Sequence, residues 1–154
     1  MNTDNSIHEY YIRLKESESR MNTHEARVSL ETAKMLQKAG FDWECEYAIL
    51  PGTEMGNTPY RYNKGKSNNY NNKEAYPFEI YSAPSLDVAQ RWLREVYQLH
   101  ITVFSSSQES WMFRITKPHQ KLEDGAYGED FYTYEEAQEA GIQKCLTLLL
   151  NDGK

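Results

Sequence analysis

In the C-terminal half of the chain, the spacing of apolar side chains changes from helical to alternating and back to helical. Residues 85–97 repeat apolar positions every three or four residues, which predicts a helix. Residues 99–104 and 111–116 alternate apolar and polar positions, which predicts two antiparallel strands joined by a serine-rich turn. A short strand at 130–132 and a helix at 134–150 complete the order α-β-β-β-α. We therefore predict an α+β fold with an antiparallel sheet packed against the helices.

The apolar stripes of these elements predict the core. The helix at 85–97 should bury one face, and the helix at 134–150 should bury a face made of smaller residues. Ala137, Ala140 and Gly141 leave room for the last helix to lie close to the layer that it covers. The predicted inward positions are Leu86, Ala89, Trp92, Leu93 and Val96 in the helix at 85–97, Trp111 and Phe113 or the opposite face of their strand, and Tyr134, Ala137, Gly141, Cys145 and Leu148 in the last helix.

The N-terminal half gives weaker signals. A capping box opens a predicted helix at 6–14, and Ser29 and Gly40 bracket a second predicted helix. Strands are expected at 43–50 and 76–81. A chain of 154 residues fits one domain, so we expect a single α+β domain over 1–154.

The segment from Asn57 to Lys73 differs in composition from the rest of the chain. Six of its seventeen residues are asparagine, and it has four basic and no acidic residues. Since the net charge of the whole chain is −6, the remainder carries −10. Glycine and asparagine favour turns, so we expect an inserted loop here. Tyrosine and asparagine are typical of binding loops, because one supplies rigid contact area and the other adaptable hydrogen bonds.

Composition excludes some classes of protein. The acidic balance argues against a general nucleic-acid binder. No apolar run is long enough to span a membrane, and the N-terminus lacks the pattern of a signal peptide. Cys45 and Cys145 lie in unrelated contexts, which favours a reduced, cytoplasmic protein.

We find no motif for catalysis, a metal or a cofactor. The four histidines lack the spacing of a metal site. Cys145 falls on an inward face, where a thiol is usually inert. Arg91 and Arg94 flank a tryptophan and could hold phosphate, but Asp87 and Glu95 stand four residues either side of Arg91, so intrahelical ion pairs are the better interpretation.

Two resemblances bear on context. The segments 29–36 and 38–42, Tyr81-Ser82-Ala83-Pro84-Ser85, 90–96 and 133–137 resemble small uncharacterised proteins of gut anaerobic bacteria and their phages or prophages. This resemblance implies an accessory protein of a mobile element, with no activity to carry over. The element order of 85–150 is similar to the double-stranded-RNA-binding domain. That family binds phosphate at a basic start of its last helix, where this chain has Glu135 and Glu136.

These observations favour a non-catalytic binding or regulatory protein that contacts another protein. A nucleic-acid-binding module that uses the basic loop 57–73 is the alternative, and an enzyme of unrecognised type is the second alternative. In each binding hypothesis, the predicted recognition surface is formed by loop residues Tyr60, Arg61, Tyr62, Lys64, Lys66 and Tyr70. A continuous positive stripe would favour nucleic acid, and a deep pocket with convergent polar groups would favour an enzyme.

Overall fold

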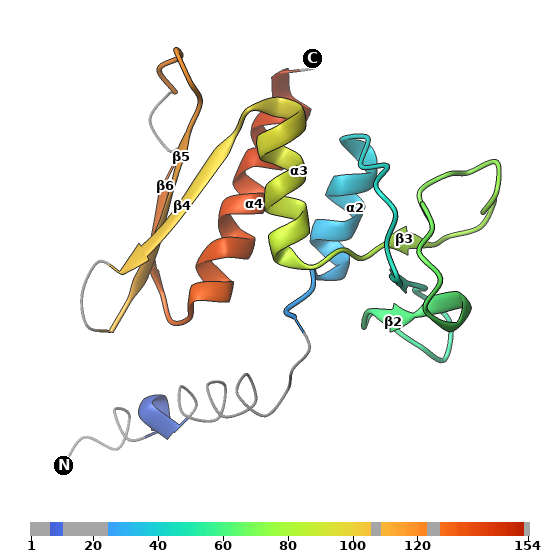
Figure 1. Cartoon of the computed structure of the whole chain (residues 1–154). Helices are drawn as coiled ribbons and strands as arrows, with labels where there is room; N and C mark the ends of the chain where they lie inside the picture. The colour runs from blue at the N-terminus through green and yellow to red at the C-terminus, as the bar shows by residue number, and fades with distance from the viewer. Residues whose placement is uncertain (1–6, 11–24, 106–108, 123–126, 153–154) are drawn as a thin grey trace.

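The structure, a computed structural model, describes residues 7–10, 25–105, 109–122 and 127–152. Figure 1 shows the helices lying between a larger and a smaller sheet. The α+β class is therefore confirmed. Its elements are α2 (Leu30–Lys38), β1 (Tyr47–Ile49), β2 (Tyr60–Arg61), a 3-10 turn η1 (Tyr62–Gly65), β3 (Tyr81–Ser82), α3 (Leu86–Tyr97), β4 (His100–Ser105), β5 (Trp111–Thr116), β6 (Tyr127–Phe131) and α4 (Tyr134–Asp152).

The larger sheet has the order β4-β5-β6 and is antiparallel throughout. Together with α3 and α4 it gives the predicted α-β-β-β-α order. The third strand is longer than the predicted 130–132, because it begins at Tyr127 and contains Gly128. A Cβ atom on Gly128 would lie 2.3 Å from the ring of Phe113, so only glycine allows this pairing.

Helix α4 lies across the larger sheet and also contacts α2 and α3. Ala137, Gly141 and Cys145 are buried as predicted, and Ile142 and Leu146 are buried beside them. Tyr134 was expected on the inward face but is 40% exposed, and its ring packs edge-on against Trp111 of β5 with centroids 5.5 Å apart. The start of α4 is capped by Thr133, whose hydroxyl accepts a hydrogen bond from the Glu136 amide at 3.1 Å.

Helix α3 buries Leu86, Ala89, Trp92 and Leu93, as its apolar spacing predicts. Val96 was expected with them but is 45% exposed. Tyr97 takes its place in the last turn, where its ring packs edge-on against Trp92 with centroids 5.3 Å apart. The predicted pair between Asp87 and Arg91 is replaced as well, because the Asp87 carboxylate accepts from the Gln138 side chain at 2.7 Å.

Helix α2 begins and ends where the sequence predicts. The Ser29 side chain accepts from the Thr32 amide, and Gly40 has a φ of 94°. The Phe41 amide donates to the Leu36 carbonyl at 2.9 Å, which closes the C-terminal turn and brings Phe41 into the core. Most of the helix predicted at 6–14 lies outside the described residues. The part that is described, residues 7–10, is helical.

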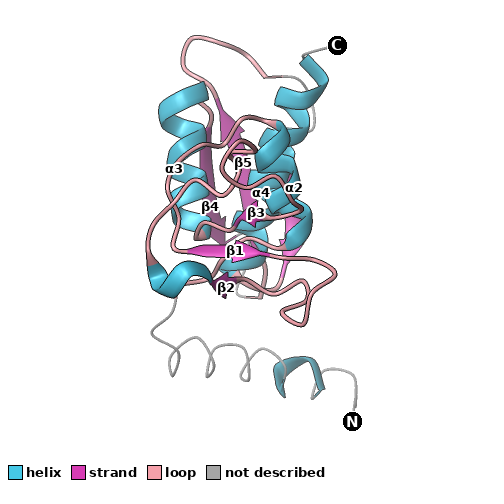
Figure 2. Ribbon diagram, turned by 90° about the vertical axis from the view of Figure 1, so that its right-hand side faces the viewer, coloured by secondary structure: helices cyan, strands magenta, loops and turns pink. Residues whose placement is uncertain are grey.

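The smaller sheet has the order β2-β1-β3, and Figure 2 views it from its own side of the molecule. Its strands are shorter than the predicted 43–50 and 76–81. Around Cys45 the chain pairs only once, with Asn68. Before β3, the carbonyl groups of Phe78 and Ile80 accept from the Lys73 ammonium group instead of from a neighbouring strand.

Truncation of Trp92 should destabilise the fold most clearly. Its side chain is buried between Phe41 and Tyr97, with both ring centroids at 5.3 Å. We expect Trp92→Ala to lower the free energy of unfolding by about 3–5 kcal/mol, measured by urea denaturation. Val96→Ala, on the exposed side of the same helix, should change it by less than about 1 kcal/mol. Equal midpoints for both variants would contradict this placement of the core.

Candidate functional site: the tyrosine row

The loop 57–73 is tied to the smaller sheet at its middle. The amide of Asn68 donates to the Cys45 carbonyl at 3.0 Å, and the amide of Cys45 donates to the Asn68 carbonyl at 2.9 Å. Residues before this bridge form β2 and η1, and residues after it enter a small core. The loop is thus a packed part of the fold. The sequence analysis predicted an inserted loop here but did not predict this packing.

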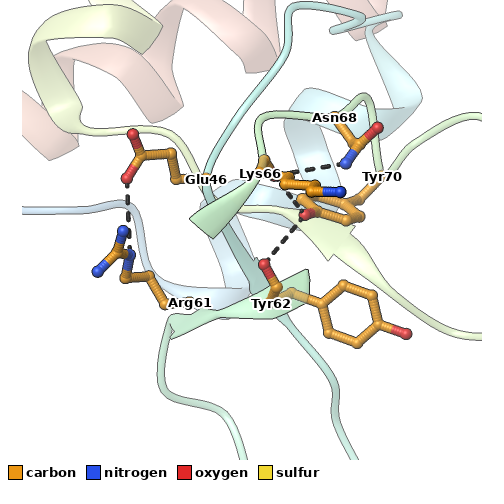
Figure 3. Close-up of polar contacts among 6 residues, drawn as sticks. All are labelled: Glu46, Arg61, Tyr62, Lys66, Asn68 and Tyr70. Carbon is orange, nitrogen blue, oxygen red and sulfur yellow. Dashed lines mark hydrogen bonds and ion pairs between the residues drawn. The ribbon is translucent and has the colours of Figure 1, made fainter. Parts of the chain in front are cut away.

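Tyr70 lies at the centre of that small core, with Ala48 and Ile80. Its side chain is fully buried. Its hydroxyl donates to the Lys66 carbonyl at 3.0 Å and lies 3.4 Å from the Tyr62 carbonyl, as Figure 3 shows. Tyr70 was predicted in the recognition surface, and that placement is wrong, because no partner can reach a fully buried ring.

Four other rings extend from Tyr70 to the surface in a connected series. We call the five residues Tyr60, Tyr62, Tyr70, Tyr76 and Phe78 the tyrosine row. The distances between ring centroids are 6.3 Å for Tyr60–Tyr62, 5.3 Å for Tyr62–Tyr70, 5.1 Å for Tyr70–Tyr76 and 6.2 Å for Tyr76–Phe78. Most of these contacts are edge-to-face, the arrangement that aromatic pairs prefer.

The two ends of the tyrosine row reach solvent. Tyr60 is 37% exposed and Phe78 is 46% exposed, while Tyr62 and Tyr76 are half-buried. Because the inner rings rest on Tyr70, the outer rings are held in place before any partner arrives, which reduces the entropy lost on binding. The prediction of a strand at 76–81 included Tyr76 and Phe78 and so missed them as surface residues. Their position next to Pro77 was the signal that could have revealed them.

Asn71 joins this region to the rest of the fold. Its side-chain nitrogen donates to the Phe41 carbonyl at 2.9 Å. Its side-chain oxygen accepts from the Ser82 amide at 3.1 Å and from the Gln37 side chain at 3.1 Å. One carboxamide therefore links the end of α2, the body of α2 and β3. Sequence reasoning assigned the asparagines to turns and recognition, and missed this structural role.

The basic residues of the loop do not act as one positive surface. Arg61 lies 3.7 Å from the Glu46 carboxylate, as Figure 3 also shows. Lys73 is exposed, but its ammonium group is held by the Phe78 and Ile80 carbonyls at 3.0 and 3.1 Å, and partial desolvation there lowers its pKa. Lys64 and Lys66 are exposed.

The surrounding charge is acidic on balance. Residues 42–81 contain six acidic and four basic side chains, a net charge of −2. Arg91, which could have extended a positive stripe, forms the predicted pair with Glu95 at 2.9 Å. The net charge around the tyrosine row is therefore negative, which is unlike the basic surfaces that bind a phosphate backbone.

Groups suited to catalysis have structural surroundings. Cys45 and Cys145 are free thiols, and burial raises the pKa of each to about 12. Neither thiol is therefore activated as a nucleophile. Within the part of the chain that the structure describes, no three histidine, cysteine or carboxylate side chains gather as a metal would require.

One hollow of about 420 Å³ carries several charged groups. Its lining includes Arg27, Glu135, Glu136 and Glu139 over apolar atoms of Leu86. The Glu139 carboxylate accepts from the Ser29 amide at 2.9 Å, and the Arg27 guanidinium stacks on the ring of Tyr47 at 3.5 Å. Glu139 and Arg27 are thus engaged in contacts that hold the fold together.

No family model matches the chain, and neither a curated protein nor a solved structure matches it. Among the described residues, no helix has the length and apolar character needed to cross a membrane.

The hydroxyl of Tyr70 should contribute to stability while that of Tyr60 should not. Tyr70→Phe removes the hydrogen bond from the buried Tyr70 side chain to the Lys66 carbonyl, which should cost about 1 kcal/mol of unfolding free energy. Tyr60→Phe, at the exposed end of the tyrosine row, should change it by less than about 0.5 kcal/mol. Urea denaturation of both variants measures the difference, and an unchanged Tyr70→Phe midpoint would contradict the packed loop.

Both thiols should be protected in the folded chain. Because their pKa values are raised to about 12, almost no thiolate exists at pH 8 until the surrounding structure opens. We expect Ellman's reagent to react with both cysteines at least about a hundredfold more slowly in buffer than in 6 M guanidinium chloride. Cys145→Ser isolates the rate for Cys45. Immediate reaction of Cys45 in the native chain would show that the loop is open.

Proposed function

We propose that this chain is a non-catalytic binding protein that contacts a segment of another protein through the tyrosine row. The observation that carries this proposal is the fixed series of rings from the buried Tyr70 to the exposed Tyr60 and Phe78. Rigid, partly exposed aromatic side chains are the residues that most often anchor protein interfaces. Adjacent Lys64 and Lys66 supply positive charge at one side, so the preferred segment carries an apolar residue next to a carboxylate.

Charge favours a protein partner over a nucleic acid. A nucleic-acid site needs several cations free to contact phosphates, and here Arg61 and Lys73 already have partners within the fold. The free, buried thiols suit a reducing compartment such as the cytoplasm. The resemblance to proteins of gut anaerobes and their phages or prophages supports an accessory role in a mobile element.

Selection of peptides tests this proposal directly. A displayed library of random peptides is panned against the full chain, and enriched peptides are synthesised for fluorescence anisotropy. We expect Tyr60→Ala to weaken their binding by about tenfold or more, because loss of an aromatic anchor usually costs over 1 kcal/mol. The matched control is Tyr127→Ala, which removes an exposed tyrosine from the larger sheet and should leave affinity unchanged.

The charged residues give a second arm of the same experiment. Replacement of Arg61, Lys64 and Lys66 together by serine should leave folding nearly intact, since exposed charges contribute little to stability. Peptide affinity should then fall less than it does in Tyr60→Ala. Enriched peptides that bind Tyr60→Ala and the triple variant as well as the parent would refute the proposal. Tight binding of a fluorescent oligonucleotide, with a salt dependence that flattens in the triple variant, would replace it by the nucleic-acid alternative.

A further inference from the structure

The outer edge of β4 differs from every other strand edge in the described part of the chain. Its six residues, His100 to Ser105, contain no lysine, arginine, carboxylate or proline, and pair with β5 without a register shift. Edges of this kind present unpaired backbone groups that can pair with another strand.

The other edges are protected in different ways. Strand β6 carries Glu129 and Asp130, and its pairing with β5 has a register shift. Strands β2 and β3 have only two residues each, and the Ser82 amide of β3 is capped by the Asn71 side chain at 3.1 Å. Short length, charge and irregular pairing are the usual means by which proteins prevent contacts between edges.

The direction of the β4 backbone groups follows from one hydrogen bond. The Gln90 side chain donates to the Ile101 carbonyl at 2.9 Å, so this carbonyl points away from β5. In an antiparallel strand, alternate residues direct both backbone groups to the same side. Val103 and Ser105 therefore share the outward direction of Ile101, and no side chain like that of Gln90 is seen on their backbone groups within the described residues.

The sheet face that continues from this edge is apolar at its centre, and it is not the face that α3 and α4 cover. The helices cover the other face, where Ile101, Phe113 and Ile115 are buried. On the open face, Phe104 stands opposite Met112, and the Arg114 guanidinium lies 5.9 Å from the Phe104 ring. Figure 1 shows this sheet at one side of the molecule, away from the smaller sheet.

We propose that two copies of this chain pair antiparallel along β4, which joins their larger sheets into one continuous sheet. With the two-fold axis perpendicular to the sheet at Val103, Val103 meets its own counterpart as a hydrogen-bonded pair. Thr102 then lies opposite the counterpart of Phe104, and Ile101 opposite that of Ser105. The Ile101 carbonyl has two lone pairs, so it accepts from the Ser105 amide of the second copy as well as from Gln90. Each pair joins residues of the same sheet face, and the edge brings no charged residue against itself.

A second copy is the occupant that this register favours. The chain is acidic overall, and a joint between identical molecules is disfavoured wherever like charges meet. The β4 edge avoids that cost because its residues carry no carboxylate or ammonium group. This proposal does not depend on the tyrosine row, which lies on the opposite sheet.

Sedimentation velocity of the full chain from 5 to 300 µM tests the proposal. We expect a reversible dimer in the parent chain. Thr102→Lys adds two ammonium groups close together across the joint and should raise the dissociation constant about tenfold or more. The matched control is Thr116→Lys, the same substitution at an exposed position on the same face of the neighbouring strand, which should dimerise like the parent.

Hydrogen exchange locates the contact without any substitution. The amides of Val103 and Ser105 should become more protected as the concentration of the parent chain rises, and those of β6 should not. A parent chain that stays monomeric up to 300 µM would overturn the proposal. The alternative would then be that an extended segment of another protein pairs with the β4 edge. A dimer with unchanged β4 protection, or one equally weakened by both lysine variants, would also overturn it.

Discussion

The arrangement of the helices and of the tyrosine row depends on how closely α4 approaches the larger sheet. A Cβ atom on Gly141 would lie 2.9 Å from Ile101 and 3.2 Å from Phe113, so the sheet and helix meet at a distance that only glycine allows without rearrangement. From the other side of α4, Gln143 donates to the Thr32 hydroxyl of α2 at 2.9 Å. Helix α2 in turn holds Asn71 through Gln37. The tyrosine row is thus positioned by a series of contacts that begins at the sheet.

Polar side chains carry much of this series. On α4, Gln138 reaches α3 and Glu139 reaches the start of α2, while the apolar residues of α4 face the sheet. Gln138 is nearly fully buried and its amide is matched by two acceptors, Asp87 and the Gln90 side chain. Hydrogen bonds of this kind fix the relative position of packed helices more narrowly than apolar contact alone, because each has one geometry.

The sequence predicted what depends on local pattern. Neighbouring residues determine where two helices begin, at Ser29 and Ser85, and where the chain reverses, at Gly40. They also determine the alternation in β4 and β5. All of these features appear in the structure. It did not predict features that need a distant partner. Val96 is exposed because Tyr97 covers Trp92, a choice that the helical spacing alone leaves open. Tyr70 is buried partly through Ala48 and Ser82, and Asn71 contacts Phe41 and Gln37. These four partners lie more than ten positions away in the chain.

The side-chain carboxamide of Asn71 also affects how the sequence of this fold can evolve. It holds β3 in place by occupying the edge where another strand would otherwise be needed. The stretch between η1 and Asn68 belongs to no strand, and its backbone meets the small core where the Lys66 carbonyl accepts from the Tyr70 hydroxyl. Insertions and deletions there would alter the outline of the surface beside Tyr60 while leaving the sheet intact. Variation between related chains could thus accumulate in length as well as in residue type, without loss of the scaffold.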